Sequence, residues 1–182
     1  MPTLKQTEKD GSLFFLTIKA INGLPILRNN KYYQVILDSL KYCRENKGWK
    51  VYAYTILINH LHIMLKVKDN FSLLETVSDF KSFTAHKILK LLREDKQYDI
   101  LDEMRMSAYR TKDRDNKIWR KSCWPEILLS KRFIRQKGKY INLNAMEHYV
   151  VKDIENYLYT SYHNHYCNHE VVLEIDDIKE LF

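Results

Sequence analysis

Two histidines separated by a single residue are the clearest chemical feature of this sequence. His60 and His62 lie in an apolar run, residues 57–65. Successive side chains of a β-strand point to opposite faces, so both imidazoles would project from one face while Leu61 and Ile63 face the core. Two neighbouring imidazoles make half of a divalent-metal site. The pattern also fits a pair of core histidines satisfied by hydrogen bonds, and both interpretations stay open here.

A tyrosine and an asparagine could complete such a site. Tyr140 and Asn144 are four residues apart, which places them on one side of a helix expected over residues 131–143 and its end. If this helix docks on the face of the sheet that carries the histidines, His60, His62 and Asn144 could hold a divalent cation. Tyr140 would then face a phosphate bound by that cation. Alternatively, Tyr140 is a half-buried packing residue, one of 13 tyrosines.

The hydrophobic periodicity predicts the elements that would position these residues. Their order is strand, helix, strand, strand, helix, strand, helix, over residues 12–21, 30–45, 49–55, 57–68, 73–92, 117–129 and 131–143. This order predicts an α+β fold, a ferredoxin-like βαββαβ antiparallel sheet with an additional C-terminal tyrosine-bearing helix. The histidine strand would be central, and its ligand face could be the face left open by the other helices.

The length of 182 residues suits one domain with a tail. We expect a flexible arm over residues 1–11, a catalytic domain over 12–145 and a tail over 146–182 that packs on the domain. Residues 93–116 are rich in charge and lose apolar rhythm towards their end, so we expect a partly helical, mobile insertion there.

Composition points towards nucleic acid. The net charge is +7, and 13 tyrosines accompany only four glycines, a surface suited to a phosphate backbone and stacked bases. The three cysteines are scattered, which favours reduced thiols and a cytoplasmic location. No apolar run approaches the length of a membrane span, and the first residues lack the apolar core of a signal peptide, so we expect no membrane partner.

Basic side chains near aromatic ones are the candidate contacts to nucleic acid. The candidates are Lys81, Lys87, Arg120, Lys121, Trp124 and Arg132. Lys81 and Lys87 could instead form a solvated helix face. Trp119 and Trp124 could be core residues. A second histidine tract, residues 163–169, could bind zinc, but no second Cys/His pair lies nearby to complete a tetrahedral site, so we interpret it as an exposed, incidental tract.

The chain resembles the HUH single-tyrosine transposases, in particular the REP-associated tyrosine transposases. The resemblance covers about residues 12–166. His60-Leu61-His62 stands where the family has its His-hydrophobic-His metal motif, and Tyr140-Ile141-Asn142-Leu143-Asn144 resembles its Tyr-Ile-His-x-Asn-Pro element. Three further segments resemble a lysine-bearing helix, a Trp-Gln segment with its following strand, and the stretch after the tyrosine: residues 79–84, 118–126 and 155–162.

This resemblance implies a DNA-nicking and strand-joining enzyme. The metal, Mg²⁺ or Mn²⁺, would be held by the two histidines and a side chain of the tyrosine helix; Tyr140 would form a 5′-phosphotyrosine and release a 3′-hydroxyl. The substrate would be single-stranded or hairpin DNA, and both monomers and homodimers are known in the family. The chain departs from the pattern at Asn142, Ala145 and Arg120, where the family has histidine, proline and glutamine. The alternative function is a hairpin-binding module that kept the fold and lost the chemistry.

Overall fold

A four-stranded antiparallel sheet forms the centre of the molecule. The computed structural model describes residues 11–111, 117–123, 125–167 and 171–182. The strands are β1 (Leu13–Lys19), β2 (Trp49–Leu57), β3 (His60–Val67) and β4 (Glu126–Ile127), in the spatial order β2-β3-β1-β4. All three neighbouring pairs are antiparallel. This confirms the predicted α+β, ferredoxin-like arrangement, with the histidine strand β3 at a central position.

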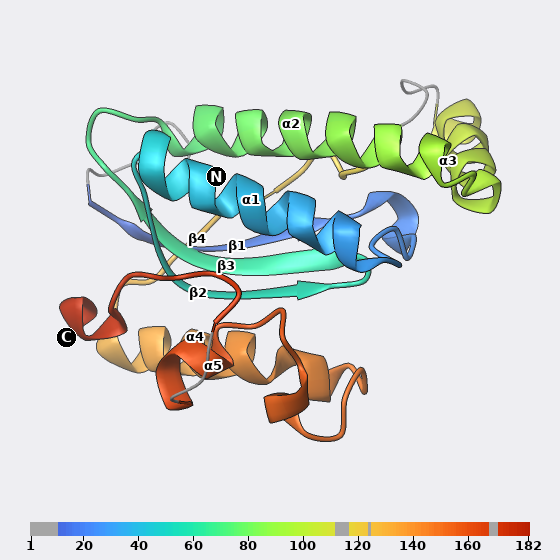
Figure 1. The fold of residues 1–182 in the computed structure, drawn as a ribbon. Coiled ribbons are helices and arrows are strands. Elements are labelled where there is room, and N and C mark those ends of the chain that lie inside the picture. The colour runs from blue at the N-terminus through green and yellow to red at the C-terminus, as the bar shows by residue number, and fades with distance from the viewer. Residues whose placement is uncertain (1–10, 112–116, 124, 168–170) are drawn as a thin grey trace.

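Two helices cover one face of the sheet. Helices α1 (Asn30–Asn46) and α2 (Leu73–Glu94) lie side by side over it (Figure 1). Each begins at a capping side chain, Asn29 and Ser72, which accepts a hydrogen bond from a backbone N–H of the first turn. Their apolar stripes, including the fully buried Ile36 and Ile88, pack against the sheet and form the main core.

The opposite face is covered by the tyrosine helix. Helix α4 (Lys131–Glu147) begins directly after its capping residue Ser130 and runs one turn beyond the predicted end, which brings Asn144 inside it. The helix lies beneath the sheet in Figure 1. Ile134 and Ile141 are buried with Phe15 and Met64 in a second apolar cluster between α4 and the central strands.

Two segments differ from their predictions. Within residues 93–116, helix α3 (Tyr98–Thr111) buries Ile100, Leu101 and Met104, so most of the expected insertion is a packed helix; residues 112–116 lie outside the described residues, as do 1–10 of the predicted arm. The strand predicted over residues 117–129 is reduced to the two residues of β4 and one bridge between Trp119 and Ala20. The indole of Trp119 is buried and donates to Thr84 Oγ1 at 2.9 Å, a packing role.

The C-terminal segment ties α4 to the edge of the sheet. Residues 159–161 run along β2: the Ile56 N–H donates to the Tyr159 carbonyl at 2.9 Å, and the Ser161 N–H to the Tyr54 carbonyl at 2.8 Å. The Ser161 hydroxyl accepts from the Tyr54 N–H and lies 2.6 Å from Asn142 Oδ1, to which it donates. We call residues 159–161 the tail strand. Around it lie the short helices η3 (Ile154–Asn156), α5 (Tyr162–Tyr166) and η4 (Ile178–Leu181).

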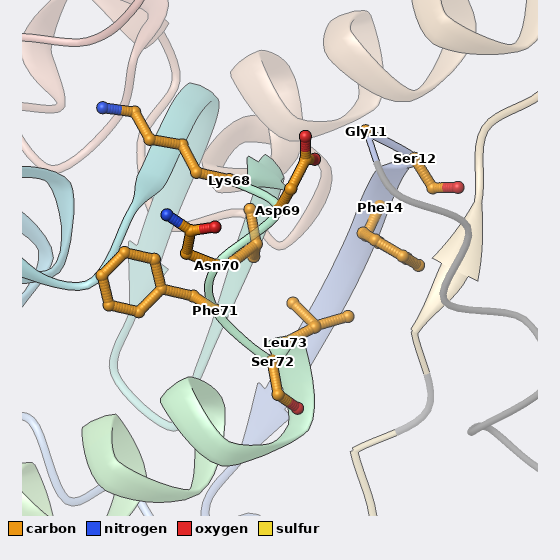
Figure 2. A pocket seen from close by; sticks show the side chains of 10 residues that line it. Gly11, Ser12, Phe14, Lys68, Asp69, Asn70, Phe71, Ser72 and Leu73 are labelled. Atoms are coloured by element: carbon orange, nitrogen blue, oxygen red, sulfur yellow. The ribbon is translucent and has the colours of Figure 1, made fainter.

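A surface hollow of about 260 Å³ lies where β3 leads into α2. Figure 2 shows Lys68, Asp69 and Asn70 around it, with Phe71 and Ser12 nearby. It adjoins the end of β3 opposite to His60, so it is separate from the histidine pair. Among the described helices, none has the length and apolar character needed to cross a membrane.

Candidate metal and nucleophile site

The structure brings the two histidines and the tyrosine together. His62 is buried and His60 half-buried, with ring centroids 4.9 Å apart. Tyr140, on α4, places its hydroxyl 3.4 Å from His62 Nε2. A phenol therefore lies beside two imidazoles on the face of β3 that α4 covers.

Hydrogen bonds to Nδ1 orient both imidazoles. Asn59 Nδ2 donates to the Gly23 carbonyl at 3.1 Å, so Asn59 Oδ1 is left to accept from His60 Nδ1–H at 2.6 Å. The Thr17 hydroxyl lies 2.8 Å from His62 Nδ1. A hydroxyl can donate or accept, and a metal on Nε2 would select the tautomer in which His62 Nδ1–H donates to Thr17. Both Nε2 atoms are thereby directed to the space beside Tyr140.

The surroundings keep both histidines neutral. Burial, followed by the charges of His148 and Lys19, lowers the pKa of His60 to about 4. Burial, followed by the charges of His60 and Lys19, lowers the pKa of His62 to about 3. At neutral pH both rings therefore carry free lone pairs, the form in which imidazole binds a metal.

Asn144 is the unsatisfied member of the site. It is completely buried, and although it lies close enough to His60 to raise the pKa of that ring, neither Oδ1 nor Nδ2 has a hydrogen-bonding partner in the described structure. An orphaned buried amide costs about 1–3 kcal/mol. A cation or substrate bound beside the imidazoles would remove that cost.

The donor set of the site fits a divalent cation with open coordination positions. Within the described part of the chain, no group of three or more His, Cys, Asp or Glu side chains is arranged to hold a metal. The protein ligands available here are therefore two imidazoles and one amide oxygen. Imidazole and oxygen donors suit Mn²⁺ and, less well, Mg²⁺.

Three residues around the site were missed by sequence reasoning. Phe15 stacks on His62 with centroids 5.3 Å apart and meets Tyr140 edge-on at 6.1 Å. The exposed His148 ring lies 5.3 Å from His60, and Lys137 lies near Phe15. His148 had a signal in its spacing, because it follows Asn144 by four residues and caps the C-terminus of α4. Phe15 had none, because it depends on how β1 pairs with β3.

The predicted DNA contacts are spread over both sides of the molecule. Lys81 Nζ donates to the carbonyl oxygens of Arg120 and Lys121 at 2.8 and 3.0 Å, so its ammonium anchors that loop, and burial lowers its pKa. Lys87 is exposed on α2, on the far side of the sheet from α4, which carries the exposed Arg132 (Figure 1). The side chains of Arg120 and Lys121 are also exposed, and Trp124 lies outside the described residues.

The second histidine tract has a packing role in the structure. His163 Nε2 lies 3.1 Å from the Tyr157 carbonyl, and His165 Nε2 lies 3.0 Å from the Tyr52 carbonyl. Both ring nitrogens therefore donate to the backbone and help to fix the C-terminal segment. The interpretation as an exposed, incidental tract was wrong for the buried His163.

Comparison with known families places this site in context. Residues 25–103, which include both histidines, match the family model described as "Transposase IS200 like". This part of the chain is similar to the IS200-like transposases. The match ends before α4, so the contribution of Tyr140 rests on the geometry above.

One solved transposase structure shares the fold, and a second gives a weaker superposition. A REP-associated tyrosine transposase, solved bound to a REP hairpin, superposes with a TM-score of 0.65 at 15% identity, covering 98% of this chain and 93% of that chain. A putative transposase from Deinococcus radiodurans R1 gives a TM-score of 0.47 at 14% identity, over 78% of this chain and 95% of that one. A comparison with curated proteins gave no match. The resemblance to transposases expected from the motifs is confirmed by the family match over residues 25–103 together with the shared fold.

Proposed function

We propose that the protein nicks and rejoins single-stranded DNA through a covalent 5′-phosphotyrosine at Tyr140, with a divalent metal held by His60, His62 and Asn144. The observation that carries the proposal is the Tyr140 hydroxyl 3.4 Å from His62 Nε2, beside a second imidazole and an unpartnered amide. The match of residues 25–103 to a transposase family model supports this reaction class.

In this reaction the Tyr140 oxygen attacks the scissile phosphorus as the bond to the 3′-oxygen breaks. The phenol loses its proton, the departing oxygen gains one, and a 3′-hydroxyl is released. A bound Mg²⁺ or Mn²⁺ would polarise the phosphate and neutralise developing charge. Thr17 and Asn59 orient the imidazoles, and the stacked Phe15 limits access of water to His62. Attack by another 3′-hydroxyl on the phosphotyrosine joins strands.

We propose hairpin DNA as the substrate. A relative of the same fold was solved with a REP hairpin bound, and the net charge of +7 suits a polyanion. The exposed Lys87, Arg120, Lys121 and Arg132 are the proposed phosphate contacts.

The test is a covalent adduct assay. The natural chain is incubated with a library of labelled DNA hairpins and Mn²⁺, and adducts are resolved on a denaturing gel. We expect an adduct that disappears with EDTA and with Tyr140→Phe, and persists with Tyr98→Phe, a control at an exposed tyrosine of α3. Absence of adduct across the library, or an adduct retained by Tyr140→Phe, would contradict the proposal.

One observation favours a second candidate function, a non-catalytic hairpin-binding module. Asn142 stands where the resembled family has histidine, and its side chain is committed to the Ser161 hydroxyl rather than to the site. Hairpin binding that is tight, unaffected by EDTA and unaffected by His60→Ala, without any adduct, would favour this function over catalysis.

A further inference from the structure

Lys137 lies one helical turn before Tyr140 and is folded back over the sheet. Its Nζ lies 4.3 Å from the ring centroid of Phe15 and 5.3 Å from that of Phe133, and 2.6 Å from Glu126 Oε2. Only 22% of its side chain is exposed. A lysine normally extends its ammonium into water, so this one is held at an unusual place for a cation.

That place adjoins the candidate site. The ring of Phe15 that lies under Lys137 also stacks on His62 and meets the edge of Tyr140. The positive charge of Lys137 acts on His62 and contributes to lowering the pKa of that ring. Lys137 is thus separated from the imidazoles by one aromatic ring.

Among the described residues, the charges that shift the pKa of the two imidazoles are all positive. Lys19, the strand partner of His60 in the β1–β3 register, and Lys137 both act on His62, and no carboxylate of this part of the chain is among those charges. A metal would add further positive charge. The positive charge of such a site is compensated by a ligand that carries more than one negative charge, as a DNA strand does.

We propose that Lys137 binds a DNA phosphate next to the one attacked by Tyr140, and that Glu126 holds the lysine in position until that phosphate displaces the carboxylate. The proposal rests on the function proposed above. The Glu126 side chain is 44% exposed and can return to water, whereas Lys137 is largely covered. A partly exposed ion pair is weak, so exchanging the carboxylate for a phosphodiester is favourable.

The first experiment measures the salt dependence of binding to a single-stranded hairpin oligonucleotide by fluorescence anisotropy. Lys137→Gln should reduce the slope of log K against log salt by about 0.7, one single-strand phosphate contact. Its adduct formation should slow about tenfold through loss of a charge-assisted hydrogen bond. Lys139→Gln is the matched control, an exposed lysine two residues further along α4, and should keep the natural slope and rate.

The second experiment changes Glu126, the other member of the ion pair. Glu126→Gln removes the carboxylate that competes with the phosphate, so hairpin binding should become tighter. If the ion pair has a purely structural role, both Lys137→Gln and Glu126→Gln would keep the natural affinity for the hairpin and only their melting temperatures would fall. If Lys137→Gln does not fold, an unchanged affinity in Glu126→Gln alone overturns the proposal.

The two proposals can fail separately. If Tyr140→Phe abolishes the adduct while Lys137→Gln keeps the natural slope and rate, the role of Lys137 is refuted and the catalytic function stands. If the natural chain forms no adduct, the catalytic function fails, and an unchanged slope in Lys137→Gln would refute the phosphate contact independently.

Discussion

Acidification should destabilise the metal-free protein through His62. This ring has a pKa of about 3 when folded, against 6.5 for an ordinary histidine, because burial and nearby positive charges disfavour the imidazolium. Above pH 6.5 neither state holds the proton; below it the unfolded chain takes one up while the folded protein does not. The free energy of unfolding therefore falls as pH decreases from 6.5 towards 3, and the loss between pH 7 and pH 5 is about 2 kcal/mol.

The measurement is urea denaturation in EDTA at pH 7 and pH 5, comparing the natural chain with His62→Gln. Glutamine does not titrate and can still form a hydrogen bond to the Thr17 hydroxyl. The loss of unfolding free energy on acidification should be smaller in the variant by about 2 kcal/mol. His60 acts in the same direction in both proteins and cancels in the comparison. His86→Gln, at an exposed position of α2, controls for loss of an imidazole outside the site.

If the free energy of unfolding falls by the same amount between pH 7 and pH 5 in the natural chain and in His62→Gln, this reasoning is refuted. That result would mean that protonated His62 is accommodated in the folded protein, either because water enters the site or because α4 moves away from the sheet.

Three further predictions concern neighbours of the site. Thr17→Val should weaken Mn²⁺ affinity about tenfold to a hundredfold, because the partner that orients His62 is lost; isothermal titration calorimetry showing natural affinity would contradict this. Asn142→Ala should lower the free energy of unfolding by about 1–3 kcal/mol, since it leaves the buried Ser161 O–H without an acceptor, yet leave Mn²⁺ affinity unchanged; a loss of affinity in calorimetry would make Asn142 a ligand. Tyr149→Gly should raise the free energy of unfolding in urea by about 1 kcal/mol, because Tyr149 has a left-handed backbone with φ of 55°; no gain would show that the strain is absent.

The regular elements could be predicted because their signals are local. Helix α2 shows its apolar stripe and its cap Ser72 within one stretch of sequence, and α4 shows its cap Ser130. The alternation around His60 and His62 identified β3, and the order of elements then placed it at the centre of the sheet. The spacing of Tyr140 and Asn144 was enough to propose a shared site.

The remaining features depend on pairing between distant segments. Thr17 lies opposite His62 only through the register of β1 with β3, 45 residues away in sequence. The ion pair between Lys137 and Glu126 depends on how α4 docks against β4, a strand too short to show an alternating pattern. Helix α3 was misjudged because its dense charge hides the few apolar residues that it buries.

The tail strand bears on how the chain behaves towards other copies of itself. Residues 159–161 occupy the outer edge of β2, which would otherwise present unpaired backbone groups to a second sheet. The same segment fastens α4 through Ser161 and Asn142. A chain cut before residue 157 would lose both restraints, so its helix α4 could leave and dock on another chain. Removing this segment would therefore favour reciprocally exchanged dimers, in which the histidine pair of each chain lies beside Tyr140 of its neighbour.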